Sequence, residues 1–406
     1  MALYLDRLIS LIIFFSIGSL LFIDKGGILL GFIFILSLVG LFVRRHESSP
    51  LKKWEKLFLT SFISFFLVIL ANVIYFDGAL RDIDTMSRFI FAIPIFLYFR
   101  KSNISNSYLF SGLYFAAILF GANVFSQKYA GMEIIEFSKP GQVGIISLYG
   151  GMLGTLFYFL INKNNGNIRN FVYFVAGYLG IGLSVLMSGR GVWLASIVTF
   201  MLLFIFNPMH WTMKEKFKVS LTVIVSVFLL YISPQSGMKS KIDTTLQNSI
   251  KYIQEEDHRS SLGARLEMWK GALLISKENI FFGIGENNFK EHKAKLIDKG
   301  ILTEWVARYN HPHGEYLATL TEQGIIGLFF LIYVLFFPII FSLIQIRNKS
   351  QISDYKIVMV ASISLHFALY SLTNGVFDHQ NTTLFYSIFI SIFLALWSRD
   401  KNIKEL

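Results

Sequence analysis

Long apolar blocks separated by polar stretches are the feature of this sequence that most limits its fold. Most blocks contain roughly 15–22 residues, close to the length that an α-helix needs to cross ~30 Å of hydrocarbon. The chain of 406 residues is 54% hydrophobic and has a mean hydropathy of +0.56, whereas about 45–50% of the residues in a soluble domain are apolar. We therefore expect an all-α polytopic membrane protein that forms a single integral membrane domain over residues 1–406.

The apolar blocks predict about twelve transmembrane helices, which places both termini on one side of the membrane. The predicted spans cover residues 8–23, 28–43, 57–76, 89–99, 108–125, 143–161, 171–187, 192–206, 217–232, 325–346, 357–372 and 384–397. One large polar segment, residues 233–324, separates the ninth span from the tenth. We expect amphipathic helices in this segment, because Leu262, Leu266, Trp269 and Leu273 form an apolar stripe at helical spacing. Ser261 is the predicted N-cap of that helix.

The distribution of basic residues predicts the orientation of these spans. The termini and loops on one side hold 19 Lys and Arg, the short loops on the other side hold 6, and segment 233–324 holds 12. Lys and Arg are enriched in cytoplasmic loops, and long segments count little in this rule. Both termini are therefore predicted to be cytoplasmic, and segment 233–324 to face outward. The net charge of +11 is attributed to these loops, so we expect no nucleic-acid partner.

Ionisable side chains are scarce within the predicted spans and gather at their outward ends. A transporter or flippase usually carries ionisable groups at mid-membrane depth, and this chain lacks that pattern. The pattern favours instead a site at the outer membrane surface, which a lipid-borne substrate would reach laterally. The polar residues at the outward span ends are Asp82, Asp84, Arg88, Arg190, Asp378 and His379.

Two histidines near the end of the outward segment are candidates for proton transfer. His311 and His313 lie in the sequence Asn310–Tyr316, shortly before the apolar stretch that begins near Gly324. Imidazole is the side chain best suited to moving a proton near neutral pH. The alternative is an interfacial histidine bonded to a backbone carbonyl. On chemistry alone the two histidines are equivalent.

Two arginines are candidates for binding phosphate, because guanidinium forms planar, bidentate bonds with phosphate oxygens. Arg190 lies between glycines in the short turn predicted between spans 7 and 8, and Arg265 lies beside the apolar stripe of the predicted helix. The alternatives are an arginine that reaches the lipid headgroups and a solvated helix arginine paired with Glu267 or Glu286.

Acidic residues give two further candidate sites, both for metal ions. Asp82 and Asp84 form a D-x-D pair that would hold a divalent ion against a diphosphate. The cluster Glu255–His258 is the second candidate, but its composition favours a solvated loop over a metal site. The sequence contains no cysteine, which excludes disulfides and thiolate chemistry. It also contains no Walker loop, dinucleotide fingerprint or H-E-x-x-H helix.

Three stretches resemble the bacterial O-antigen ligases and the related O-antigen polymerases. The first is His313-Gly314 followed, after nine residues, by Gly324-Ile325-Ile326-Gly327; the family usually has Asn, Ser or Gln where this chain has Gly314. The second is Ser188-Gly189-Arg190-Gly191 with Trp193. The third is the stretch from Ser261 to Leu266 with Met268, which includes Arg265 and is more typical of the ligases.

The resemblance implies both an activity and a set of roles. O-antigen ligases transfer polysaccharide from undecaprenyl pyrophosphate to a sugar hydroxyl of lipid A-core, in the inner membrane and at its periplasmic face. They are metal-independent, inverting enzymes of GT-C-like glycosyltransferase architecture, and we expect no cofactor. His313 is then the expected base for the acceptor hydroxyl. Arg190 and Arg265 are the expected pyrophosphate ligands, with Arg88 as a weaker third. The polymerase is the alternative enzyme, and a lipid-linked sugar flippase is the alternative of another class.

Overall fold

The computed structural model describes part of the chain, and every regular element in that part is a helix. The described residues are 2–22, 27–47, 49–105, 108–109, 111–112, 115, 126, 190–206, 212–234, 237–255, 259–347 and 354–405. The predicted spans at 143–161 and 171–187, and most of the one at 108–125, lie outside them. The remaining predicted spans all coincide with helices. These helices are α1 (Ala2–Phe22), α2 (Gly27–Val43), α3 (Lys53–Tyr75), α4 (Ser87–Phe99), α8 (Arg190–Phe206), α9 (Met213–Ile232), α14 (Gly324–Arg347), α15 (Tyr355–Tyr370) and α16 (Gln380–Glu405).

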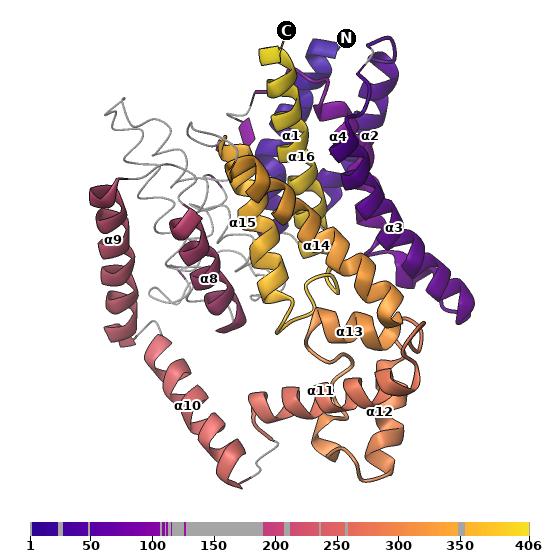
Figure 1. Cartoon of the computed structure of the whole chain (residues 1–406), viewed down its shortest axis with the longest axis vertical. Coiled ribbons are helices and arrows are strands. Elements are labelled where there is room, and N and C mark those ends of the chain that lie inside the picture. The colour runs from indigo at the N-terminus through magenta and orange to yellow at the C-terminus, as the bar shows by residue number, and fades with distance from the viewer. Residues whose placement is uncertain are drawn as a thin grey trace.

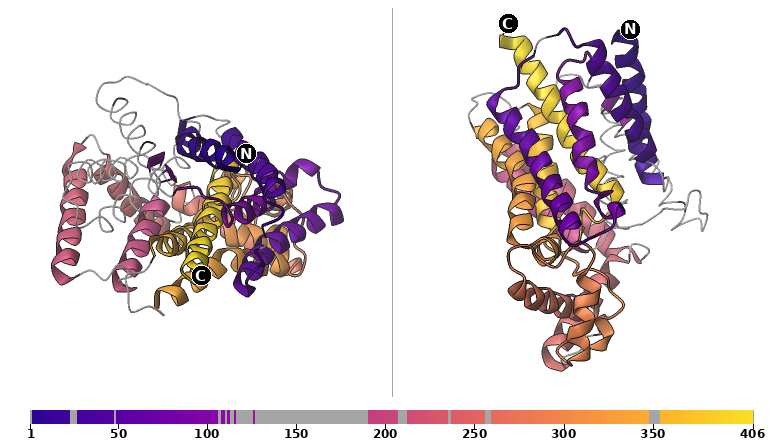
Figure 2. Two further views of the ribbon diagram at one scale, coloured as in Figure 1. Left: turned by 90° about the horizontal axis from the view of Figure 1, so that it is seen from above. Right: turned by 90° about the vertical axis from the view of Figure 1, so that its right-hand side faces the viewer.

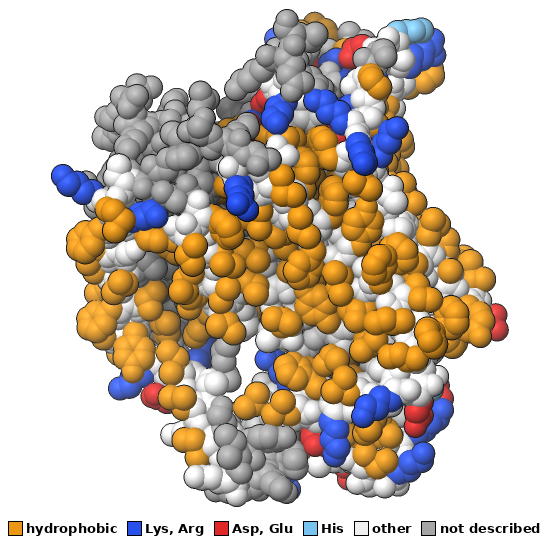
Figure 3. Space-filling model, in the orientation of Figure 1, with side chains coloured by type: hydrophobic (Ala, Val, Ile, Leu, Met, Phe, Trp, Pro, Cys, Tyr) orange, Lys and Arg blue, Asp and Glu red, His pale blue; other side chains and the backbone are white. Residues whose placement is uncertain are grey.

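Several of these helices have the length and composition of membrane spans. Among the described residues, α3, α14 and residues 380–401 of α16 are long and apolar enough to cross a membrane. Helices α2, α4, α8 and α15 are shorter apolar helices. In the space-filling view, hydrophobic side chains cover the middle of the molecule, and most Lys and Arg side chains lie above and below them (Figure 3). This is the surface expected of a membrane-embedded helical protein.

The apolar helices run roughly along the long axis of the molecule, and both termini lie at the same end (Figure 1). Helices α8 and α9 lie to one side of the others. The opposite end holds α10 (Met238–Glu255), α11 (Ser261–Glu278), α12 (Phe289–Asp298) and α13 (Glu315–Glu322). Figure 2 shows this end in two further views. All four of these helices fall within or at the edge of the predicted outward segment 233–324.

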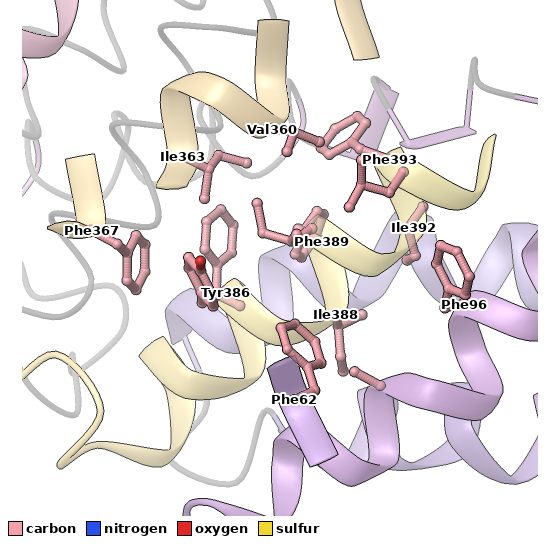
Figure 4. Packing of buried hydrophobic residues seen from close by; sticks show 14 of the residues in the cluster. Phe62, Phe96, Val360, Ile363, Phe367, Tyr386, Ile388, Phe389, Ile392 and Phe393 are labelled. Atoms are coloured by element: carbon pink, nitrogen blue, oxygen red, sulfur yellow. The ribbon is translucent and has the colours of Figure 1, made fainter. Parts of the chain in front are cut away.

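Helix α16 is the central helix of the bundle. In its apolar stretch 94% of the residues are buried, compared with 44% in both α3 and α14. It packs against α4, α15 and α2, and its side chains Phe389 and Phe393 lie among the buried apolar residues shown in Figure 4. An apolar helix that is enclosed in this way contributes little surface for lipid.

Buried ion pairs close the bundle at the end with the termini. Arg44 of the α2 end pairs with Asp6 of α1 at 2.6 Å, and Arg100 pairs with Glu55 of α3 at 2.7 Å. The side chains of all four residues are at most 7% exposed. Glu55 also accepts a hydrogen bond from Ser398 Oγ at 2.6 Å. Each buried charge at this end therefore has an opposite charge in contact.

A second, smaller core lies beneath α11 and corrects the predicted helix face. The buried side of α11 carries small residues with Met268 and Ile275, which pack against Leu302 and Val306. The apolar stripe predicted from Leu262 to Leu273 is not the buried face of α11, since Leu273 is 47% exposed. The N-cap is Ser260, whose Oγ accepts a hydrogen bond from Gly263 N at 3.0 Å, and not Ser261.

Candidate functional site

The turn between α13 and α14 packs against the loop that precedes α12. Gly324 has a φ of +69°, and a Cβ at this position would collide with the carbonyl oxygen of Phe281. Only glycine combines this left-handed backbone with so close an approach. Ile325 N donates to Ile280 O at 2.8 Å, and Ile284 N donates to Thr321 O at 3.0 Å. These contacts fix the C-terminal end of α13, the helix that follows the His311–Gly314 turn.

His313 lies in a strained turn that is closed by His311. Its φ of +54° is in the left-handed region, which non-glycine residues rarely adopt and which often marks a functional position. The backbone N–H of His313 donates to His311 Nδ1 at 3.2 Å, and the two ring centroids are 4.1 Å apart. His311 thus supports the turn, whereas the half-buried His313 ring remains available for other contacts.

Asn374, in the loop between α15 and α16, connects His313 to α15. Its side chain is hydrogen-bonded to the His313 ring, and its Nδ2 donates to the Tyr370 hydroxyl. Within the described part of the chain, His313 Nδ1 is buried and has no hydrogen-bond partner. The contact with Asn374 therefore orients the ring.

The surroundings of His313 favour the neutral ring. Burial lowers its pKa to about 4, and the nearby positive charges of His311, Arg265 and His379 act in the same direction. The hydrogen bond that the His313 ring donates to the Asn374 side chain opposes this shift in part. Because the pKa lies well below 7, the ring is neutral at physiological pH and is able to act as a base.

Arg265 and Trp269 bring α11 to the His313 turn. The charge of Arg265 acts both on His313 and on the Tyr370 hydroxyl. Trp269 follows one turn later on the same side of α11, and a Cβ at Gly314 would lie 3.6 Å from its Nε1. The structure thus brings together two of the predicted site residues, Arg265 and His313.

The first turn of α8 packs against the loop that carries Asn374. Helix α8 begins at Arg190. A Cβ on Gly191 would collide with Thr373 Oγ1 and would lie 3.1 Å from the Tyr370 ring, so this contact requires glycine. The backbone of Arg190 is therefore adjacent to the 370–374 stretch. The Arg190 side chain itself lies outside the described part of the chain.

Comparison with known proteins agrees with this arrangement. Residues 175–332, which include Arg190, Arg265 and His313, match the family described as O-antigen ligase. This match supports membership of the O-antigen ligase/polymerase superfamily. A protein of Haemophilus influenzae (strain ATCC 51907 / DSM 11121 / KW20 / Rd), described as uncharacterized, is 24% identical over 367 residues, which cover 87% of this chain and 89% of that protein. Membership of the superfamily supports a ligase or polymerase activity in lipopolysaccharide biosynthesis.

Arg88 lies in the first turn of α4 and is already paired. Its guanidinium nitrogens contact both carboxylate oxygens of Asp84, at 2.9 and 3.0 Å. Asp84 also accepts a hydrogen bond from Gln380 at 2.7 Å, next to His379. Through Asp84, Arg88 is connected to Gln380 at the end of the 374–380 loop. The carboxylate of Asp84 also neutralises the charge of Arg88.

The acidic residues of the two predicted metal sites also have protein partners or fall outside the described residues. Asp82 accepts hydrogen bonds from Ala79 N at 2.9 Å and from Asn287 Nδ2 at 3.0 Å, and Asp84 is held by Arg88. Within the described ranges, no group of three or more His, Asp or Glu is arranged to hold a metal ion. In the cluster Glu255–His258, only Glu255 belongs to the described residues.

Glu315 is a residue near the candidate site that the sequence did not reveal. Its buried carboxylate accepts a hydrogen bond from Phe377 N at 3.0 Å, and its own N–H donates to Ser371 O at 2.8 Å. These bonds fix the start of α13 to the loop that carries Asn374. Burial and the nearby Asp378 raise the pKa of Glu315 well above its usual value. Glu315 therefore sets the position of Asn374 relative to His313.

Further carboxyl groups surround the loop behind His313. Asp378 Oδ2 lies 3.7 Å from His311 Nδ1. Burial and the charge of Asp378 raise the pKa of Glu286 to about 7, and burial, Glu286 and Asp378 raise that of Glu322. Because these carboxyl groups would repel one another as anions, their closeness favours the protonated forms of Glu286 and Glu322.

Asn374, like Glu315, was missed by reasoning from the sequence. A signal for it was present, because the stretch from Thr373 to Asn381 concentrates polar side chains between two apolar spans. Only Asp378 and His379 were singled out there, since they ionise. No sequence signal connects Glu315 with Phe377, because that contact depends on how two loops meet.

Proposed function

We propose that the protein is an O-antigen ligase that transfers polysaccharide from undecaprenyl pyrophosphate to a sugar hydroxyl of lipid A-core. The proposal includes twelve spans in a GT-C-like architecture in the inner membrane, with both termini cytoplasmic. The site then faces the periplasm, together with segment 233–324. The observation that carries the proposal is the convergence on Asn374: His313 is bonded to it, Arg265 acts on the same histidine, and α8 begins beside it.

In the proposed reaction, the neutral His313 ring accepts the proton of the acceptor hydroxyl. The hydroxyl oxygen attacks the anomeric carbon from the face opposite the diphosphate, the bond to the diphosphate oxygen breaks, and its electrons pass to the leaving group. Arg190 and Arg265 bind the pyrophosphate and neutralise the negative charge that develops. Arg88 supports them only after it has exchanged Asp84 for a phosphate oxygen.

Donor binding would also strengthen the base. The charge of Arg265 helps to lower the pKa of His313 to about 4 in the free protein. A bound diphosphate would offset that charge, so the pKa of His313 would rise towards the operating pH, where a general base is most effective. The arginines thus connect donor binding with activation of the acceptor.

Replacement of His313 tests the base assignment. We expect His313→Ala to lower the rate of transfer by at least about 10²–10⁴-fold, measured as ligated lipopolysaccharide formed by the purified protein. His311→Ala is the matched control, because it removes a neighbouring imidazole that holds the turn, and we expect a smaller loss. Equal amounts of both variants in the membrane are required for the comparison. Near-normal transfer by His313→Ala would exclude it as the base.

The gel pattern of a deletion strain separates the ligase from the alternative polymerase. Loss of a ligase leaves bare core, with lipid-linked polymer accumulating, whereas loss of a polymerase leaves core that bears a single repeat unit.

Treatment of the purified protein with EDTA tests the metal-independent mechanism. We expect unchanged activity, and a loss restored by Mg²⁺ would show that Asp82 and Asp84 bind a metal.

A further inference from the structure

A continuous row of side chains in contact leads from His313 to the protein surface. The Tyr309 and His313 ring centroids are 5.5 Å apart. The Arg308 guanidinium carbon lies 5.0 Å from the Tyr309 ring centroid, and Arg308 donates a hydrogen bond to the Tyr309 hydroxyl at 3.0 Å. The same guanidinium carbon lies 3.8 Å from the Trp305 ring centroid. Trp305, Arg308 and Tyr309 are called the outer stack below.

The backbone of the outer stack is held rigidly from beneath. Lys293 of α12 is completely buried, and its Nζ donates to the carbonyl oxygens of Val306, Ala307 and Tyr309. Thr303 N, just before the short 3-10 helix Glu304–Val306, donates to Glu267 Oε2 at 3.2 Å. The stack therefore belongs to a preorganised surface, which reduces the entropy lost when a ligand binds.

The residues of the outer stack are those that bind a charged sugar. Trp305 is 38% exposed, and Arg308 is exposed. The flat indole and phenol rings offer apolar faces for the C–H groups of a pyranose ring. A guanidinium that is stacked on a ring keeps its N–H donors in its own plane, where they reach phosphate or carboxylate oxygens. The combination selects an oligosaccharide that carries anionic groups.

We propose that the outer stack is a subsite for the anionic oligosaccharide of the acceptor, and this proposal rests on the proposed function. A base must contact the hydroxyl from which it takes a proton. A binding surface that begins at His313 is therefore placed for the molecule that carries that hydroxyl, and the remainder of its saccharide extends over Tyr309, Arg308 and Trp305. The loop lies with α11 and α12 at the end of the molecule opposite the termini, beyond the apolar helices (Figure 1).

Direct binding tests the subsite without requiring transfer. The probe is core oligosaccharide freed from lipid A, used with its phosphate groups and after their removal, and titrated by calorimetry into the full-length protein in lipid nanodiscs. We expect Trp305→Ala to weaken binding of both forms about tenfold, as is usual for a central tryptophan contact. We expect Arg308→Gln to weaken binding of the phosphorylated form about tenfold and to change binding of the dephosphorylated form less than twofold. Trp305→Phe should restore most of the affinity.

The matched control is Arg45→Gln. Arg45 stacks on Phe42 at 4.8 Å, near the termini, so its replacement removes a similar pair far from the site and should leave binding unchanged. In the transfer assay, the outer-stack variants should raise KM for the acceptor and leave KM for the donor unchanged.

Two results would overturn the subsite: wild-type affinity in both Trp305→Ala and Arg308→Gln, or a rise of KM for the donor alone. A different result would separate the two proposals. If the wild-type protein forms no ligated product but binds the oligosaccharide in a way that depends on Trp305, the proposed ligase activity is refuted and the subsite proposal stands. Unchanged melting temperatures of the variants are required, and Trp305→Phe provides the test should Trp305→Ala fail to fold.

Discussion

The two ends of the helical bundle treat charge in opposite ways. At the end with the termini, Arg44 contacts Asp6 and Arg100 contacts Glu55, so buried charges cancel in pairs. At the other end, the neutral His313 ring is half-buried near the positive charge of Arg265, and burial together with Asp378 raises the pKa of both Glu286 and Glu315. Paired charges hold helices together, whereas ionisable groups without an opposite charge in contact leave binding capacity for a ligand. We infer from this difference that the end opposite the termini holds the site.

Breaking a pair at the end with the termini should have the largest effect on stability. Arg100→Met leaves the carboxylate of Glu55 buried without its cation, which typically costs about 3–5 kcal/mol. We expect a much lower melting temperature and an unchanged transfer rate per folded molecule. The double variant Glu55→Gln with Arg100→Met is the control and should recover part of the stability. A loss of specific activity in the folded single variant would contradict the division between the two ends.

Arg265→Gln should instead impair activity with little effect on stability. The loss of a charge-assisted bond to phosphate costs about 1.5–3 kcal/mol, which lowers kcat/KM on the order of 10- to 150-fold. Because Arg265 lowers the pKa of His313, its removal raises that pKa. The acidic limb of the profile of kcat/KM against pH should therefore move to higher pH. An unshifted limb would show that Arg265 does not act on the base.

Glu286→Gln should have the smallest effect, and it should depend on pH. The folded-state pKa of Glu286 is raised to about 7 from 4.5, so folding favours the protonated form. The stability that this group contributes is complete below pH 4.5 and is lost as the pH rises through 7. Because Gln resembles the protonated acid, we expect Glu286→Gln to be more stable by about 1 kcal/mol at pH 8, with allowance for solvent at this half-buried residue, and equal at pH 4.5. Thermal unfolding at both pH values measures this, and equal melting temperatures at pH 8 would contradict it.

The helices could be predicted from the sequence because the length of a membrane span is a local property. Each apolar block in the described ranges coincides with a helix, from α1 to α16. The side of a helix that is buried could not be predicted in the same way, as α11 demonstrates. Its core face carries Ala264 and Ala272, which allow Leu302 and Val306 to approach closely, whereas the more apolar Leu273 is exposed.

The candidate site was predictable only where ionisable residues stand out in the sequence. His313 and Arg265 were predicted and do lie together. Asn374 and Glu315 were not, because an amide that orients a ring and a carboxylate that accepts backbone N–H groups act through contacts between distant loops. Whether the Arg190 side chain joins them remains a prediction.

The burial of α16 has a consequence for how the protein is made. This helix lies at the centre of the bundle, yet the ribosome synthesises it after α2, α4 and α15, against which it packs. The earlier helices enter the bilayer before α16 covers the faces that pack against it. The packing of these helices is therefore completed only when α16 has been inserted.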